Sequence, residues 1–206
     1  MGGGTLQYRH VDIRVLSQKM KLHYSISLVL VWQVADAEAR HLKAPNIEPM
    51  HLLLALCKVV DLDLPALVSK DSPDRDEVLE ELLREVRKLR TILRTSNVDA
   101  KILRRRLRGV AMKDRFSLGE SGRLRRSPAA REIFAEAEKF AQIGDATVYP
   151  IHLLYATLTD SDPDRDALFK ELKIDKKRLI DTVKGGVISR ADKSPSMKSN
   201  SRTRWN

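Results

Sequence analysis

Apolar residues recur along this chain with the spacing of amphipathic helices. Residues 22–44 and 78–93 carry apolar side chains three or four positions apart, which places them on one face of each helix. In the first stretch they are Leu28, Trp32, Ala35, Ala39 and Leu42, and in the second Val78, Leu82, Val86, Leu89 and Leu93. We therefore predict an all-α protein, with its first long helix ended by Pro45, since proline pushes the residue before it out of the helical region.

Two shorter stretches are apolar on nearly every side and repeat each other. They read Pro49-Met50-His51-Leu52-Leu53-Leu54-Ala55-Leu56 and Pro150-Ile151-His152-Leu153-Leu154-Tyr155-Ala156-Thr157-Leu158. Proline suits the first turn of a helix, and a helix without a polar face belongs in a protein interior. We predict two buried core helices, with Pro49, His51, Pro150 and His152 as the equivalent landmarks of an internal repeat.

The repeated unit extends beyond the core helix on both sides. A second long helix is expected to start at Ser127-Pro128, an N-cap followed by proline, and to stop at Gly144-Asp145. Later in each unit, residues 97–103 resemble residues 173–179. Their expected N-caps are Asp99 and Asp175, and their expected terminators are Gly109 and Gly185. The pattern predicts two pseudo-twofold related four-helix repeats in one compact domain.

The first repeat is the longer of the two. His51 and His152 are 101 positions apart, whereas Asp99 and Asp175 are 76 apart, so about 25 extra residues lie between them in the first repeat. Most of the extra residues fall in the amphipathic stretch 74–93, whose counterpart at 164–172 is short. We predict one elongated, solvated helix in the first repeat, projecting from a compact body.

Charge and composition divide the chain further. Of its 206 residues 42% are hydrophobic and 32% charged, the balance of a globular protein, and the net charge is +10. Residues 101–131 hold eleven basic and two acidic residues, and residues 189–206 hold five and one. The expected organisation is an N-terminal arm (1–21), a double-repeat domain (22–186) and a disordered basic tail (187–206). Within the domain we expect repeat one at 22–111, a linker at 112–126 and repeat two at 127–186.

The single cysteine, Cys57, allows no internal disulfide and no cysteine-based metal site. It follows an apolar run, so we interpret it as an inert core thiol, and a reducing, cytoplasmic location is expected. No apolar run has the length of a transmembrane helix, and no secretory signal precedes the first helix. We therefore expect no membrane partner.

The long-helix sequence Ala37-Glu38-Ala39-Arg40-His41-Leu42, followed by the first core helix, resembles a known family. A second match is Ala135-Glu136-Ala137-Glu138-Lys139-Phe140-Ala141, followed by the second core helix. Both are similar to the Clp N-terminal repeat domain at the front of Clp-type AAA+ unfoldases, and the resemblance covers residues 22–186. It implies a module that docks adaptor proteins or unfolded polypeptide for a separate ATPase ring.

The resemblance also indicates where a ligand would bind. Some family members hold phosphorylated arginine with a hydroxyl residue at the start of the long helix and a glutamate just before the core-helix histidine. The hydroxyl positions match Ser25 and Ser127, but the glutamate positions are Met50 and Ile151. An apolar side chain cannot pair with a guanidinium, whereas methionine adapts to varied apolar ligands. We expect these four residues to contact a hydrophobic peptide or a partner helix.

Other chemistry is weakly indicated. His51 and His152 have no neighbouring ligand or acid-base partner, so we interpret them as capping or packing residues. The acidic turn at 160–164 lacks the glycine and distal glutamate of a calcium loop and is expected to cap a helix. There is no Gly-x-x-x-x-Gly-Lys-Ser/Thr phosphate loop, so the chain is not expected to hydrolyse ATP. We expect no catalytic, metal-binding or cofactor-binding residues.

Two functions remain open at this point. The first is a non-enzymatic peptide- or protein-binding module of the Clp N-terminal type. It would be a freestanding, chaperone-associated adaptor or competitor that regulates proteolysis by a Clp-type AAA+ ATPase. The alternative is a basic, nucleic-acid-associated protein on the same scaffold, suggested by the cluster Arg104-Arg105-Arg106-Leu107-Arg108 and the basic tail. The alternative predicts retention on DNA or RNA that falls steeply with salt.

Overall fold

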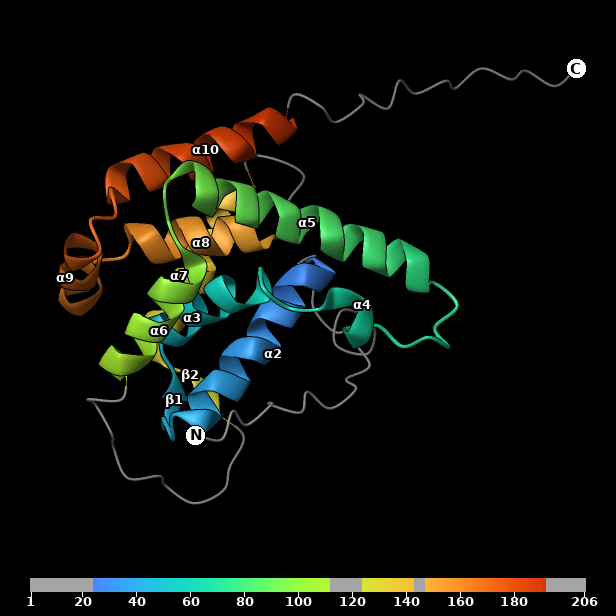
Figure 1. Cartoon of the computed structure of the whole chain (residues 1–206), viewed down its shortest axis with the longest axis horizontal. Helices are drawn as coiled ribbons and strands as arrows, with labels where there is room; N and C mark the ends of the chain where they lie inside the picture. Colours follow the sequence, from blue (N-terminus) through green and yellow to red (C-terminus); the bar gives the residue numbers. More distant parts are fainter. Residues whose placement is uncertain (1–23, 112–123, 143–146, 192–206) are drawn as a thin grey trace, which may run out of the picture.

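Residues 24–111, 124–142 and 147–191 are described by the structure, a computed structural model of the whole chain. These residues form nine helices and two strands of two residues each (Figure 1). The N-terminal arm, most of the linker, the tail beyond residue 191 and the expected helix stop at Gly144-Asp145 lie outside the described residues.

The helices follow the order that the repeat predicts. Repeat one contains α2 (Ile26–His41), α3 (Pro49–Val59), α5 (Arg75–Thr95) and α6 (Ala100–Ala111). Repeat two contains α7 (Pro128–Ala141), α8 (Pro150–Thr159), α9 (Pro163–Glu171) and α10 (Lys176–Ala191). The all-α, double four-helix fold is therefore confirmed. One further short helix, α4 (Leu64–Leu67), lies among the extra residues of repeat one and was not predicted.

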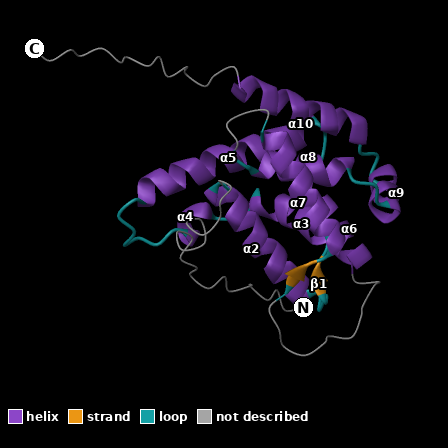
Figure 2. Cartoon of the chain, turned by 180° about the vertical axis from the view of Figure 1, so that it is seen from behind, coloured by secondary structure: helices purple, strands orange, loops and turns teal. Residues whose placement is uncertain are grey.

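Short extended segments of the two repeats pair with each other. Strand β1 (Asn46–Ile47) precedes the core helix of repeat one and pairs in parallel with β2 (Arg125–Arg126), which precedes the long helix of repeat two. In the reciprocal position, Tyr24 forms a parallel bridge with Val148. The start of each long helix is thus tied to the entrance of the other repeat's core helix, as expected for a pseudo-twofold pair. Figure 2 shows the two strands together at one end of the helical body.

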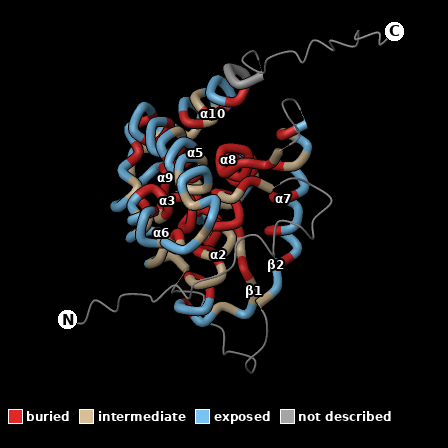
Figure 3. The backbone as a smooth tube through the Cα atoms, turned by 90° about the vertical axis from the view of Figure 1, so that its right-hand side faces the viewer, coloured by how far each residue is buried: buried red, intermediate tan, exposed pale blue. Residues whose placement is uncertain are grey.

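The core helices α3 and α8 form the centre of the domain. They contact each other, and each is covered by its own long helix and by the last helix of its repeat, α6 on α3 and α10 on α8. In Figure 3 the tube of α8 is buried along most of its length, whereas the outer sides of α5 and α7 are exposed. The prediction of two buried core helices is confirmed, because every apolar residue of α3 except Met50 is buried.

The elongated helix exists, but it does not simply project into solvent. The apolar stripe of α5 is buried at Leu82, Val86 and Leu89, and the helix packs against α2, α8 and α10. Figure 1 shows its N-terminal turns reaching past the end of α2 towards α4. No helix within the described ranges is both long and apolar enough to cross a membrane, α5 included. The extra residues of repeat one therefore cover part of repeat two.

Some helices end at other residues than predicted. The predictions had assigned these ends to Pro45, Gly109 and Gly185. Helix α2 ends at His41, before Pro45 can act, because Lys43 takes a left-handed conformation (φ 57°). The Ala44 N–H then donates to the Ala39 carbonyl, which closes the end of the helix. Gly109 lies inside α6 and Gly185 inside α10, and no described glycine has positive φ. These glycines are therefore helical residues and not terminators.

The two adjacent glycines of α10 give a test of how this helix is seated. A Cβ at Gly185 would meet nothing within 4 Å, so Gly185→Ala should raise the free energy of unfolding by about 0.5–1 kcal/mol. A Cβ at Gly186 would lie 3.1 Å from Ile151 Cδ1 and 3.4 Å from Ile92 Cδ1. Gly186→Ala should therefore gain less, or lose stability. Urea unfolding of both variants measures the difference, and a larger gain at Gly186 would contradict the packing of α10 on Ile151.

Candidate functional site

The two serines predicted to contact a ligand are buried N-caps. Ser25 Oγ accepts a hydrogen bond from the Leu28 N–H at 3.2 Å, and Ser127 Oγ accepts one from the Ala130 N–H at 3.1 Å. Their own N–H groups reach the other repeat: Ser25 donates to the Val148 carbonyl at 3.0 Å and Ser127 to the Ile47 carbonyl at 3.1 Å. Both serines therefore have a structural role that is complete without a ligand.

We expect Ser25→Ala and Ser127→Ala each to lower the free energy of unfolding by about 1–2 kcal/mol, because each removes the side-chain N-cap of a long helix at a buried position. Ser161→Ala, in an exposed turn, is the control and should change stability by less than about 0.5 kcal/mol. Thermal unfolding followed by circular dichroism compares the three. A cost confined to one of the two caps would argue against their equivalence.

The landmark histidines occupy matching positions. His51 Nδ1 accepts a hydrogen bond from the Glu48 N–H at 2.9 Å, and His152 Nδ1 accepts one from the Tyr149 N–H at 3.2 Å. Both side chains are 3% exposed. Burial lowers the pKa of His51 to about 4, against the opposing attraction of Glu38, so its ring is neutral at pH 7. The predicted capping role of the two histidines is thus confirmed.

The two apolar positions of the predicted site differ from each other. Met50 is partly exposed at the start of α3, whereas Ile151 is 6% exposed at the start of α8. Ile151 is covered by α10 at Gly186, close to Ile92 of α5. In this conformation only Met50 of the four predicted residues offers side-chain surface to a ligand. The structure therefore does not bring Ser25, Met50, Ser127 and Ile151 together as one open site.

The structurally equivalent positions of the two long helices differ by about one helical turn from those that the repeated sequence Ala-Glu-Ala indicates. The repeated sequence pairs Ala37 with Ala135, which are 98 positions apart, but the N-caps Ser25 and Ser127 are 102 apart. The buried residues agree with 102, because Ala130, Ile133, Ala137 and Ala141 follow Leu28, Val31, Ala35 and Ala39 by that number. The structural counterpart of Glu38 is consequently Phe140 and not Glu136.

Glu38 is the centre of a buried ion network in repeat one. Its carboxylate is 0% exposed and accepts hydrogen bonds from Lys58 Nζ at 2.6 Å and Arg108 Nε at 2.9 Å. Burial alone would raise the pKa of Glu38, but the bonds from Arg108 and Lys58 outweigh it and hold the pKa below its ordinary value. The network joins the long helix α2, the core helix α3 and the last helix of the repeat, α6.

Repeat two fills the equivalent space with aromatic rings. Phe140 stacks on Tyr155 with ring centroids 3.9 Å apart and meets the His152 ring edge-on. Lys184 lies 76 positions after Arg108, as Asp175 does after Asp99, and its ammonium group sits 5.7 Å from the centre of the Tyr155 ring. Two of the three network positions, those of Glu38 and Arg108, therefore hold Phe140 and Lys184 in repeat two. Tyr155, the counterpart of Leu54, completes a cation–aromatic cluster there.

An aromatic–arginine cluster is formed by residues of the two long helices and of the extended segments that precede them. Phe134 of α7 packs edge-on against Trp32 of α2 and against Tyr24, with centroids 5.8 Å and 6.3 Å apart. The exposed Arg126 guanidinium lies 4.8 Å from the centre of the Phe134 ring and 5.7 Å from that of Trp32. The Tyr24 hydroxyl donates to Glu138. We call Tyr24, Trp32, Arg126 and Phe134 the aromatic–arginine cluster.

Comparison with known proteins identifies the fold. No family model matches the sequence, and no curated protein does. Among solved structures, the Hsp104 N-terminal domain from Candida albicans aligns over 78% of this chain and 89% of its own, with a TM-score of 0.57 and 16% identity. A chain from a malarial protein secretion system aligns over 80% and 94%, with a TM-score of 0.57 and 18% identity. This chain has the fold of a Clp N-terminal domain.

Within this Clp N-domain fold, the arginine cluster of α6 is largely engaged in internal ion pairs. Arg104 Nη1 lies 3.5 Å from Asp61 Oδ2, Arg108 binds Glu38, and Arg106 pairs with Glu171 of α9. The sequence offered no signal for these partners, which lie up to 70 positions away. The alternative of a nucleic-acid surface at Arg104–Arg108 is therefore not supported, because most of its charge is already paired within the domain.

The remaining reactive side chains of the Clp N-domain fold are buried or engaged. Burial raises the pKa of the Cys57 thiol to about 12, so it stays protonated at neutral pH. Burial, and next the hydrogen bond to Glu138, raise the pKa of Tyr24 well above its ordinary value. In the acidic turn, Asp162 Oδ1 accepts from the Arg165 N–H at 3.0 Å, which confirms its capping role. The described residues contain no cluster of three or more metal-ligating side chains.

Proposed function

We propose that this chain is a non-enzymatic polypeptide-binding module that docks adaptor proteins or unfolded segments. The observation that carries the proposal is its fold, which it shares with the Hsp104 N-terminal domain over most of both chains. The interactions that its ionisable side chains already make within the domain support the same proposal. The histidine rings cap core helices, the cysteine is buried, and Glu38 is held in an ion network.

We assign the primary contact surface to the aromatic–arginine cluster. Tryptophan, tyrosine and arginine are enriched at the energetic centres of protein interfaces, where their flat side chains contact a partner at low entropic cost. Trp32 is partly exposed and Arg126 is exposed, and the rings of Trp32 and Phe134 hold the guanidinium in place. Such a surface suits an extended segment that carries both apolar and acidic residues. Met50 is an additional apolar contact in this proposal.

The partner in this proposal is a Clp-type AAA+ ATPase. The chain would present clients to the ATPase or compete with the ATPase's own N-terminal domain, and so regulate proteolysis. A reducing, cytoplasmic setting belongs to the same proposal and is favoured by the single cysteine. The partner ATPase can be tested separately from the client. Adding the chain should change the rate at which such an ATPase unfolds a model substrate, and an unchanged rate would remove this part of the proposal.

The binding surface is tested with a permanently unfolded, reduced and carboxymethylated protein carrying a fluorescent label. Wild-type chain should raise the anisotropy of the label in a saturable way, and Trp32→Ala with Arg126→Gln should weaken binding at least about tenfold. The matched control is Arg131→Gln, which removes an exposed arginine of α7 and should change affinity by less than about twofold. Absence of binding to wild-type chain would contradict the proposed function.

A further inference from the structure

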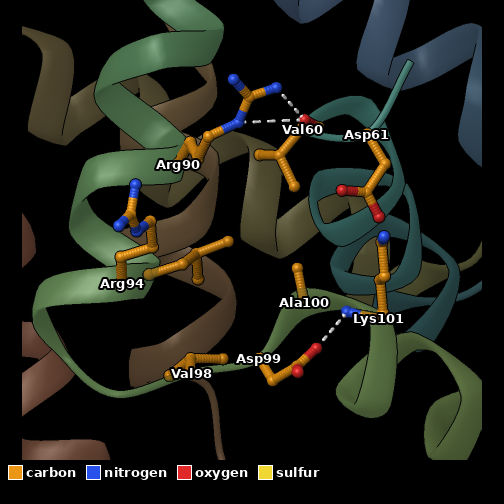
Figure 4. A pocket seen from close by; sticks show the side chains of 9 residues that line it. Val60, Asp61, Arg90, Arg94, Val98, Asp99, Ala100 and Lys101 are labelled. Carbon is orange, nitrogen blue, oxygen red and sulfur yellow. Dashed lines mark hydrogen bonds between the residues drawn. The ribbon is translucent and has the colours of Figure 1, made fainter.

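A cavity of about 360 Å³ opens between α5, the end of α3 and the start of α6 (Figure 4). Its floor is apolar and includes the buried side chains of Val60, Leu93 and Val98. Arg90 and Arg94 line it from α5 and Lys101 from α6. It lies on the elongated helix, away from the aromatic–arginine cluster, which involves α2, α7 and β2.

Some charged side chains around this cavity are paired within the domain, and others are not. Asp99 Oδ1 accepts from the Lys101 and Ile102 N–H groups at 2.8 Å and 3.0 Å, and Asp61 lies 3.5 Å from Arg104. Both carboxylates that line the cavity are thus engaged. The side chains of Arg94 and Lys101, in contrast, have no ion-pair partner among the described residues. Two of the three cations that line the cavity are therefore not paired with either of its carboxylates.

The third cation is fixed in place. Arg90 Nε donates to the Val60 carbonyl at 3.1 Å, and a second nitrogen of the same guanidinium donates to that oxygen too. Figure 4 shows the Arg90 guanidinium bound at the upper edge, with Arg94 on the next turn of the same helix. The positive end of the α6 helix dipole faces the same region and adds to its attraction for an anion. Several independent features thus favour negative charge here.

The equivalent place in repeat two is lined by different side chains. The residues 76 positions after Arg90, Leu93 and Ala100 are Asp166, Phe169 and Lys176. Lys176 Nζ binds Asp166 Oδ1 at 2.6 Å, so the counterparts of Ala100 and Arg90 form an ion pair, and a larger phenyl ring replaces the leucine. The cavity's unpaired cations are therefore a feature of repeat one that repeat two does not share at these positions.

We propose that this cavity binds a carboxylate carried next to an apolar side chain of a client polypeptide. The source of the carboxylate is either the C-terminus of the client or an aspartate or glutamate within it. The volume is at the small end of ligand pockets and suits about one or two residues. Arg94 and Lys101 bind the carboxylate, and Val60, Leu93 and Val98 contact the apolar side chain. This inference rests on the proposed polypeptide-binding function and adds a second contact point to it.

The test uses four short fluorescein-labelled peptides. One ends in Leu-Leu with a free carboxylate, and the second is the same peptide with an amidated C-terminus. The third is amidated and contains Leu-Asp-Leu, and the fourth replaces that aspartate by asparagine. Wild-type chain is compared with Arg94→Gln/Lys101→Gln. The control is Arg105→Gln/Lys177→Gln, which removes two exposed cations elsewhere on the surface.

We expect at least one carboxylate peptide to bind about tenfold more tightly than its neutral partner, because charge-assisted hydrogen bonds to arginine and lysine are strong. Preference for the first peptide identifies a client C-terminus, and preference for the third an internal acidic residue. The Arg94→Gln/Lys101→Gln variant should lose the preference, and the control should keep it. Equal binding of acidic and neutral peptides, or a preference that survives the loss of Arg94 and Lys101, would overturn the inference.

The unfolded, carboxymethylated protein separates this inference from the proposed function. If wild-type chain binds that protein but shows no carboxylate preference among the peptides, the cavity inference fails and the proposed function stands. If wild-type chain does not bind the unfolded protein but binds a carboxylate peptide through Arg94 and Lys101, the cavity is a ligand site and the proposed client class is wrong.

Discussion

Replacing Glu38 with alanine is expected to lower the free energy of unfolding by about 3–5 kcal/mol, because it removes a fully buried carboxylate that binds two partly buried cations. Lys58 is 11% exposed and hydrogen bonded to Glu38, and Arg108 reaches the same carboxylate from α6. Without the carboxylate, Lys58 and Arg108 both lose the hydrogen bonds that Glu38 accepts at the edge of the core. Urea unfolding at pH 7, compared with wild-type chain, measures the loss.

Two controls make this prediction specific. Glu136→Ala removes a carboxylate that pairs with Lys139 on the surface of α7, and it should cost less than about 1 kcal/mol. Replacing Glu38, Lys58 and Arg108 together by methionine should recover most of the lost stability, because an apolar set of similar volume replaces the whole network. A small effect of Glu38→Ala, similar to that of Glu136→Ala, would contradict the burial of this ion network.

Stability is expected to fall as pH is lowered from about 6.5 to 4, with His51 as one source of the loss. In the unfolded chain a histidine has its ordinary pKa near 6.5, whereas in the folded chain burial lowers the pKa of His51 to about 4. Between these values the unfolded state binds a proton that the folded state does not, so lowering the pH favours unfolding. The full loss is about 3 kcal/mol, complete below pH 4. Urea unfolding at a series of pH values measures this slope.

The variant His51→Gln should flatten this pH dependence, and His41→Gln, which removes an exposed histidine of α2, should leave it unchanged. Glu38 acts in a lower window, since its pKa lies below its ordinary value. Its contribution is present above its unfolded pKa and is lost only as pH falls through the folded pKa. If His51→Gln and wild-type chain lost the same stability between pH 6.5 and 4, the buried, neutral state of His51 would be wrong.

Much of the fold could be predicted because its landmarks are local. Pro49 and Pro150 start the core helices, and Ser127, Asp99 and Asp175 cap helices, as side-chain chemistry within three or four positions dictates. The helix order followed from the internal repeat. The ends of helices were harder to predict, because Lys43 adopts a left-handed conformation that glycine more often takes.

Features that depend on distant pairing had no signal in the sequence. The strands β1 and β2 are two residues long, too short for any alternation of apolar and polar positions, and they pair across about 80 residues. The stripe of α5 indicated an amphipathic helix, but not that its apolar face closes over α8 and α10. A run of arginines in α6 looked like a charged surface, because Asp61, Glu38 and Glu171 lie on other elements.

The candidate site was predicted only in part. Ser25 and Ser127 were correctly placed at helix starts, but their hydroxyls are engaged in capping, and α10 covers Ile151. The aromatic–arginine cluster was missed, since Trp32, Arg126 and Phe134 belong to three different elements. One signal was available: Tyr24-Ser25 and Arg126-Ser127 are equivalent dipeptides at the starts of the long helices. Recognising this equivalence would have directed attention to the same end of the domain.

The most direct test of the proposed function is site-specific photo-crosslinking to a client. Because Cys57 is buried and its thiol is protonated at neutral pH, a new surface cysteine can carry a benzophenone label selectively. The variants are Arg125→Cys, an exposed residue of β2 next to the aromatic–arginine cluster, and Lys170→Cys on the exposed side of α9. With the unfolded, carboxymethylated protein we predict strong crosslinking from position 125 and little from position 170. Equal crosslinking from both positions, or crosslinking from position 170 alone, would contradict polypeptide binding at this surface.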